Sequence, residues 1–265
     1  MNWNRIAQGI NDVLCIILVV RLLSLRLHRV YKVFSVFLCL QLLGSLIDMI
    51  EAHLIPGQYP DYRITWIALE IGLWVLSLWM VYALLRGVLA GLPGILKFSR
   101  NLLNGVFVAA LGVAFWSARA EYGVSKALSL PTPLGRVVGA MLVLDRAICT
   151  AALIALLAIL CFILWFPVVM PRNLAVFSIG FTIYFGATAA SWLTWSLGST
   201  ANLKIFDNVA MFILSLCYAY WAIFITAEGE SVPVRMGHSW QVSEQQRLMG
   251  QLDVINANLL RAARR

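Results

Sequence analysis

The sequence contains few charged residues. Asp, Glu, Lys and Arg make up 12% of its 265 residues, whereas roughly a quarter is typical of soluble domains. Hydrophobic residues make up 62%, and apolar blocks of about 20 residues, the length that crosses a bilayer, recur as far as Thr226. This composition excludes an ordinary soluble domain. We expect a multi-pass protein of the cell membrane, such as a bacterial inner membrane, in contact with the lipid bilayer.

Residues for familiar catalytic chemistry are also scarce. The three histidines, His28, His53 and His238, fall at the ends of apolar blocks or beyond them, so no pair can hold a haem inside a helix bundle. The sequence has no HExxH, GxSxG, P-loop or GxGxxG motif, and its five cysteines include no CxxC pair. We therefore predict that the protein is not an enzyme and holds no cofactor and no metal.

Positive charge exceeds negative charge, with a formal net charge of +8. The Lys and Arg residues lie in short clusters beside the apolar blocks, where they orient helices and meet anionic lipid, so no nucleic-acid partner is expected. More of them fall on the side that carries residues 26–32, residues 86–100 and the C-terminal tail. By the positive-inside rule this side is cytoplasmic and the N-terminus lies outside, although Arg119, Lys126 and Arg136 fall on the outer side.

Seven apolar blocks predict seven membrane-spanning helices and an all-α fold. The predicted spans are residues 10–27, 33–54, 64–85, 102–117, 138–166, 174–197 and 206–226. Pro131 and Pro133 argue against helix between the fourth and fifth spans, and the Gly91–Gly94 segment is expected to be a turn. Residues 1–226 are thus predicted to form one seven-helix transmembrane domain.

Beyond Thr226 the composition becomes polar. Residues 227–238 are predicted to be a polar linker, and residues 239–265 a cytoplasmic amphipathic helix. Its apolar stripe is Leu248, Leu252, Ile255 and Leu259. This helix is too short to be a catalytic output domain. Two alternatives stay open: it lies on the membrane surface or packs on the protein itself, including a second copy, or it docks a cytoplasmic protein partner.

An acidic residue, Glu70, lies inside the third predicted span. The rise of an α-helix places it roughly 7–8 Å from the middle of the membrane, where an acidic side chain is expensive unless it faces the protein interior. Asp48 on the second span lies at a similar depth, and Gln41 and Ser45 share its helical face. Other spans bring further polar groups toward this level. The candidate ligand or ion pocket consists of Gln41, Ser45, Asp48, Glu70, Ser77, Arg146 and Ser191.

Two interpretations of this cluster are open. In one, it forms a pocket in the outer half of the bundle for a polar ligand, an ion or a proton. In the other, Arg146 neutralises Glu70 or Asp48 and the cluster fixes the helix register. The pocket favours a receptor-like or signalling module. The alternatives are a small transporter or proton-coupled permease, against which no span is broken by Gly or Pro, and a structural or assembly subunit of a membrane complex.

Two stretches resemble a known group of proteins. The third span, with Tyr62, Trp66 and Glu70 spaced four apart, resembles the corresponding stretch of uncharacterised small seven-helix bacterial integral membrane proteins. The aromatic end of the last span, Cys217-Tyr218-Ala219-Tyr220-Trp221, followed by an acidic linker and a short polar helix, is similar to theirs as well. The resemblance covers the plan of the whole chain. It implies a single seven-helix domain and carries over no site residues.

Overall fold

The computed structural model describes residues 3–54, 60–118, 133–166, 168–196, 200–235 and 241–262, which are almost entirely α-helical. Within these ranges seven helices come first: α1 (Trp3–Ser24), α2 (Lys32–Leu54), α3 (Pro60–Val88), α4 (Pro93–Ala118), α6 (Pro133–Trp165), α7 (Arg172–Ser196) and α8 (Thr200–Phe224). An eighth helix, α9 (Val242–Ala262), follows. The remaining elements are two 3-10 turns, η1 (Leu27–Arg29) and η2 (Glu228–Glu230), and two short strands, β1 (Val169–Pro171) and β2 (Pro233–Arg235). The predicted all-α class is confirmed.

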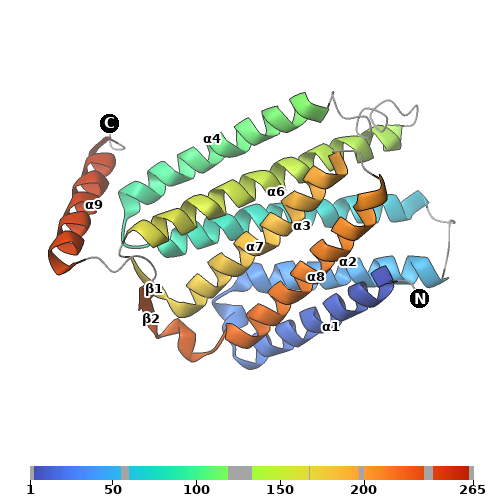
Figure 1. Cartoon of the computed structure of the whole chain (residues 1–265), viewed down its shortest axis with the longest axis horizontal. Coiled ribbons are helices and arrows are strands. Elements are labelled where there is room, and N and C mark those ends of the chain that lie inside the picture. The colour runs from blue at the N-terminus through green and yellow to red at the C-terminus, as the bar shows by residue number, and fades with distance from the viewer. Residues whose placement is uncertain are drawn as a thin grey trace.

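The first seven helices form a bundle in which successive helices run in opposite directions (Figure 1). Six of them make a closed ring in the order α1, α2, α3, α6, α7, α8, since each packs on the next and α8 packs back on α1. Helix α4 lies outside this ring. It packs mainly on α6 and α9 and only touches α3, although α3 directly precedes it in the chain.

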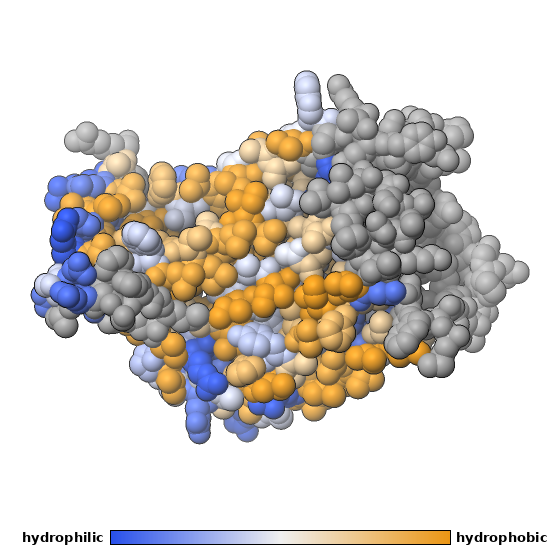
Figure 2. Space-filling model, viewed as in Figure 1, coloured by the Kyte–Doolittle hydropathy of each residue, from blue (hydrophilic) through white to orange (hydrophobic). Residues whose placement is uncertain are grey.

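Several helices have the length and composition of membrane spans. In the described part of the chain, four segments qualify: Ile6–Ser24, Thr65–Val88, Val143–Trp165 and Arg172–Ser191. Helices α2 and α8 carry shorter apolar stretches, Lys32–Ile47 and Asn208–Phe224. Large apolar side chains such as Val20, Val75 and Ile223 face outward, and Figure 2 shows apolar residues as a broad band across the middle of the molecule. An apolar surface of this extent is typical of a protein that contacts lipid, so the chain is a helical membrane protein.

Aromatic residues fill the core of the ring. Phe34 of α2 packs edge-on against Phe177 and Phe181 of α7 and against Trp221 of α8, with ring centroids 4.8–5.4 Å apart. Trp221 is fully buried, and its indole lies directly against Gly180, where an added Cβ would overlap the indole nitrogen. Gly180 therefore lets α7 and α8 approach closely, as small residues do in membrane helix pairs.

One end of the bundle carries η1, the α3–α4 connection, the β1–β2 pair and α9 (Figure 1). We call it the basic end, because Arg29, Lys32, Arg86 and Lys97 lie there. Figure 2 shows hydrophilic residues gathered at this end. The excess of Lys and Arg that the sequence places on one side of the membrane thus falls at one end of the described structure.

The segment predicted as a polar linker is tied to the basic end. Strand β2 pairs antiparallel with β1, and the hydroxyl of Tyr31 donates a hydrogen bond of 2.6 Å to the Glu230 carboxylate. Asn173 is fully buried, and its side chain donates to the Thr226 carbonyl and accepts from the Thr226 N–H, at 2.8 and 3.3 Å. Burial raises the pKa of the Tyr31 hydroxyl, and the hydrogen bond to Glu230 raises it further. Residues 226–235 therefore form a packed corner.

Helix α9 packs on the first turn of α4. The side-chain oxygen of Asn256 accepts hydrogen bonds from the backbone N–H groups of Gly94 and Ile95, at 2.6 and 3.3 Å. These N–H groups belong to the first turn of α4, where no helical carbonyl can reach them. Asn256 thus acts as an N-cap supplied by a distant helix. Of the predicted apolar stripe, Leu252 is buried, whereas Ile255 is 49% exposed.

Two helices begin earlier than predicted, both at a proline. Helix α4 begins at Pro93 and includes Gly94, where a turn was expected, and α6 begins at Pro133 instead of Val138. Proline lacks the N–H that interior helix positions need, but in the first turn that group has no helical partner. These two prolines start helices instead of excluding them.

Helix α1 is shifted relative to its predicted span. It runs from Trp3 to Ser24 instead of residues 10–27. The helix ends earlier than predicted because Arg26 adopts a left-handed backbone conformation, with φ 57°. Near its end, the guanidinium of Arg21 donates to the carbonyl oxygen of Ile225, at 3.2 and 3.3 Å, and so serves the C-terminal end of α8. A cation at the carbonyl end of a helix is stabilising, and this contact joins the first helix of the ring to the last.

Candidate functional site

A polar cavity of about 380 Å³ lies among α1, α2, α3 and α8, toward the end of the bundle opposite α9. Its walls come from the first half of α1, the second half of α2 and the first half of α3, which the antiparallel order of the helices brings to one level. The polar residues that line it are Gln8, Asn11, Asp12, Gln41, Ser45, Glu70 and Tyr218. The polar groups of four helices therefore meet around one space.

Hydrogen bonds fix one wall of this cavity. The hydroxyl of Ser45 on α2 donates to the Asp12 carboxylate on α1 at 2.8 Å and accepts from the side-chain amide of Gln8 at 3.3 Å. Toward α8, the hydroxyl of Ser215 donates to the side-chain oxygen of Asn11 at 2.7 Å. Helix α1 is thus joined to both of its ring neighbours at the level of the cavity.

The charge of the cavity wall is negative. Asp12 and Glu70 both line it, and within the described residues the lining includes no Lys, Arg or His. In a site poor in water, charges interact more strongly than they do in bulk solvent. A positively charged group that enters this cavity would meet two carboxylates and several hydrogen-bond acceptors.

A second set of polar side chains, from α3 and α6, lies beside the cavity. The indole N–H of Trp74 on α3 donates to the Asp145 carboxylate at 2.7 Å, and the thiol of Cys149 donates to the same oxygen at 3.8 Å. Trp74 lies one helical turn beyond Glu70 on α3. Three acidic residues, Asp12, Glu70 and Asp145, therefore lie in the half of the bundle that holds the cavity.

The structure brings together three of the predicted pocket residues. Gln41, Ser45 and Glu70 line the cavity. Ser77, Arg146 and Ser191 do not line it: Ser77 is buried two turns along α3 from Glu70, and the hydroxyl of Ser191 donates to the Ala187 carbonyl of its own helix. Asp48 belongs to α2, but its side chain lies outside the part of the structure that is described.

Sequence reasoning missed the contribution of α1. Gln8, Asn11, Asp12 and Cys15 are spaced so that they fall on one helical face, and all four line the cavity. The first predicted span began only at residue 10, so Gln8 was left outside the helix and its neighbours at its edge. The spacing of these four residues was a readable signal. The polar hydroxyl of Tyr218 within the apolar stretch of α8 was another.

The core closes the cavity toward the basic end. Tyr218 lines the cavity, and its ring lies 6.1 Å from that of Trp221, the centre of the aromatic core. Leu38 and Phe181, both almost fully buried, lie in the same core. No three His, Cys, Asp or Glu residues gather as a metal-binding group in the described ranges. The arrangement suits the binding of a small polar group from one end.

Together, the fold and this cavity define a class: an all-α membrane protein with a negatively charged cavity in one half of its helix bundle. A scan against protein-family models, a search of curated proteins and a search of solved structures each return no match. The resemblance to small seven-helix bacterial membrane proteins therefore stays a prediction.

Proposed function

We propose that this chain is a receptor-like or signalling membrane module that binds a small, positively charged polar ligand in the cavity lined by Asp12 and Glu70. In this proposal the seven helices α1–α8 all cross the membrane. The N-terminus and the cavity are on the outer side, and α9 is in the cytoplasm.

The observation that carries the proposal is the shared position of two carboxylates. Asp12 and Glu70 come from different helices and line one cavity of about 380 Å³. Ionisable groups inside a membrane bundle are costly and commonly mark a functional site. A cationic ligand would offset the cost of burying both acids, whereas an anionic ligand would increase it.

The position of α9 supports the receptor-like interpretation. Helix α9 packs at the basic end, whereas the cavity lies in the other half of the bundle, so binding and output would be separated across the membrane. Between them lies the aromatic core around Trp221, which contacts α2, α7 and α8 residues in one cluster. A ligand that changes the packing of Tyr218 would act directly on this core.

Binding measurements on the full chain in lipid nanodiscs test the proposal. Thermal unfolding is followed with Na⁺, K⁺, tetramethylammonium, ethanolamine and putrescine, with acetate and glycerol as an anionic and a neutral comparison. We expect at least one of the cations to raise the unfolding temperature, because a ligand that binds only the folded state stabilises it. In Glu70→Gln and Asp12→Asn its affinity should fall roughly 10- to 100-fold, the effect of losing a charged hydrogen-bond partner.

The matched control is Glu228→Gln, an exposed acid at the basic end. It should bind the same cation as the unaltered protein. Stabilisation by acetate or glycerol alone, or an equal loss in all three variants, would contradict the proposal.

A proton-coupled permease is the second candidate, since the same pair of carboxylates suits proton or cation movement. The closed aromatic core below the cavity argues against a continuous polar path in this conformation. Cation uptake into proteoliposomes that disappears in Glu70→Gln would favour the permease over the receptor.

A further inference from the structure

Two cavities lie beside the slight contact between α4 and α3, in the basic half of the bundle, although α4 packs closely on α6. One, of about 580 Å³, lies among α3, α4 and α6 and is lined by Arg86, Arg100, Tyr82 and Asn104 together with apolar residues. The other, of about 180 Å³, is lined by apolar residues except for Ser99. The two cavities share Val81 and Leu103, so they lie on either side of the point where α3 and α4 approach each other.

The larger cavity is basic at one end and apolar at the other. Arg86 of α3 and Arg100 of α4 lie toward the basic end, whereas Leu78 and Phe107 lie deeper. By the rise of an α-helix, Leu78 is about 12 Å along the axis from Arg86, and Phe107 about 10 Å from Arg100. The cavity thus runs from the level of the arginines toward the middle of the membrane.

The two arginines line the same cavity from facing helices. Side chains on a helix tilt toward its N-terminus, so Arg100 on α4 extends toward the basic end and Arg86 on the antiparallel α3 extends away from it. Because Arg100 starts deeper than Arg86, these opposite tilts bring the guanidinium groups toward one level. Both side chains are exposed, and neither has an acidic partner in the described part of the chain.

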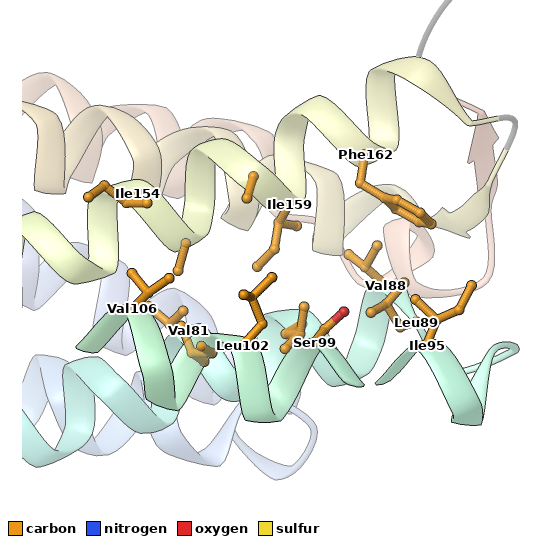
Figure 3. Close-up of a pocket in the computed structure, with 14 residues that line it drawn as sticks. Val81, Val88, Leu89, Ile95, Ser99, Leu102, Val106, Ile154, Ile159 and Phe162 are labelled. Atoms are coloured by element: carbon orange, nitrogen blue, oxygen red, sulfur yellow. The ribbon is translucent and has the colours of Figure 1, made fainter. Parts of the chain in front are cut away.

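The smaller cavity offers a second apolar slot. Figure 3 shows Ile154, Ile159 and Phe162 of α6 facing Val106, Leu102 and other α3 and α4 side chains across it. Ala158 of α6 lines the same space with only a methyl group. The smaller cavity runs from the basic end, at Leu89 and Ile95, inward to Val81 and Val106, so it passes the level of the two arginines. Two apolar slots beside a pair of arginines match the outline of a lipid with two chains and one anionic headgroup.

From this geometry we infer that α3, α4 and α6 form a binding site for one anionic glycerophospholipid of the leaflet at the basic end. Arg86 and Arg100 hold its phosphate, and arginine suits this role because its planar group donates two parallel hydrogen bonds. One acyl chain occupies the larger cavity, and part of the other enters the smaller one. Basic pockets between membrane helices on the cytoplasmic side are known to suit such headgroups. The bound lipid fills the space that the loose α3–α4 contact leaves.

Native mass spectrometry of the detergent-purified full chain tests the site. The probes are phosphatidylglycerol and phosphatidylcholine with the same two oleoyl chains, single-chain lysophosphatidylglycerol, and inorganic phosphate as a competitor. We expect one phosphatidylglycerol to bind in preference to phosphatidylcholine. In Arg86→Ala/Arg100→Ala its affinity should fall roughly 30-fold, about five- to sixfold for each basic residue, while phosphatidylcholine binding stays the same and shows that the variant is folded.

Two further variants separate headgroup from chains. Arg172→Ala/Arg247→Ala removes two exposed cations from the same end that line neither cavity, and should change the affinity less than twofold. Ala158→Phe fills the smaller cavity and keeps both arginines. It should remove the preference for the two-chain lipid over lysophosphatidylglycerol.

Three results would overturn the inference. In the first, binding is unchanged in the Arg86/Arg100 variant. In the second, the Arg172/Arg247 variant loses as much, which indicates diffuse surface charge. In the third, inorganic phosphate displaces the lipid, which indicates an anion site with no role for the chains.

Discussion

Ser45 shows how a single hydroxyl organises the polar cavity. It donates to Asp12 and accepts from Gln8. Among the described hydrogen bonds, these two connect α2 to the polar side chains of α1. A hydroxyl that both donates and accepts satisfies two partners at once. Without it, Asp12 and Gln8 would each lose a part-buried hydrogen-bond partner.

We therefore expect Ser45→Ala to lower the free energy of unfolding by about 1–2 kcal/mol, the net contribution of part-buried hydrogen bonds of which one is to a carboxylate. The control is Ser35→Ala on the same helix, whose hydroxyl donates to the Tyr31 carbonyl one turn earlier and serves no other helix. Denaturant unfolding of the two variants in the same detergent measures the difference. Equal losses would mean that the Ser45 bonds contribute nothing specific.

The sequence predicted those cavity residues that could be found from a conspicuous acidic residue in an apolar block. Glu70 drew attention because a carboxylate stands alone in an apolar block. Asp48 was matched to it by depth, and helical offsets from Asp48 reached Gln41 and Ser45. Asp12 escaped because it lies at the edge of the first predicted span, residues 10–27, and not well inside an apolar block as Glu70 does. Only the packing of α1 between α2 and α8 gives Asp12 its place on the cavity wall, and sequence periodicity does not predict which helices are neighbours.

At the scale of elements, the contact between α9 and α4 depends on one glycine. A Cβ on Gly94 would overlap the backbone oxygen of Asn256 and lie 2.8 Å from its side-chain oxygen and 3.1 Å from Leu260. Backbone atoms cannot move aside as a flexible side chain can. Gly94→Ala should therefore force α9 away from the first turn of α4.

We expect trypsin to cleave after Arg247 and Arg261 of α9 several-fold faster in Gly94→Ala than in the unaltered protein, because a displaced α9 unfolds locally more often. Gly91→Ala is the matched control three residues earlier, because a Cβ there meets no atom within 4 Å. Cleavage is followed in nanodiscs by the appearance of the shortened chain. Similar rates in both variants would show that α9 is not held by this contact.

Helix starts were the least predictable feature of the elements. Pro93 and Pro133 were expected to interrupt structure, yet each occupies the first position of a helix. For α4 the reason lies far away in the sequence, since its first N–H groups are capped by Asn256. The same contact explains why polar Asn256, and not Ile255, faces the bundle. An apolar stripe predicts the buried face only when the partner surface is apolar.

For the whole molecule, the proposed topology requires an odd number of membrane crossings. Helix α4 is the critical one, because it packs outside the ring and yet carries outward apolar residues such as Val108 and Val113, 66% and 67% exposed. If α4 crosses with the other six, the termini lie on opposite sides. If it lay on the surface, the count would be even.

A reporter that is active only in the cytoplasm, fused in turn to each terminus, distinguishes these cases. We expect activity from the C-terminal fusion and none from the N-terminal fusion, as the positive-inside rule predicts. A third fusion, within residues 89–92 between α3 and α4, should be active as well. Activity at both termini would contradict seven crossings.

That the long helices are apolar could be read from hydropathy, and four described segments have the length and composition of membrane spans. Their arrangement could not. The closure of the ring by α1 and α8, and the placement of α4 on its outside, depend on where side chains fit, as Gly180 does against Trp221. No periodicity within one helix carries that information.

The hydrogen bonds from Gly94 and Ile95 to Asn256 also affect the order in which the chain can fold during synthesis. Gly94 and Asn256 are 162 positions apart, so the ribosome makes the start of α4 long before the side chain that completes it. During that interval the first turn of α4 must rely on water or on lipid headgroups for its unpaired N–H groups. The bundle can therefore reach its final form only after synthesis has passed residue 256, and a chain that stalls earlier leaves an unfinished helix that quality-control proteases can recognise.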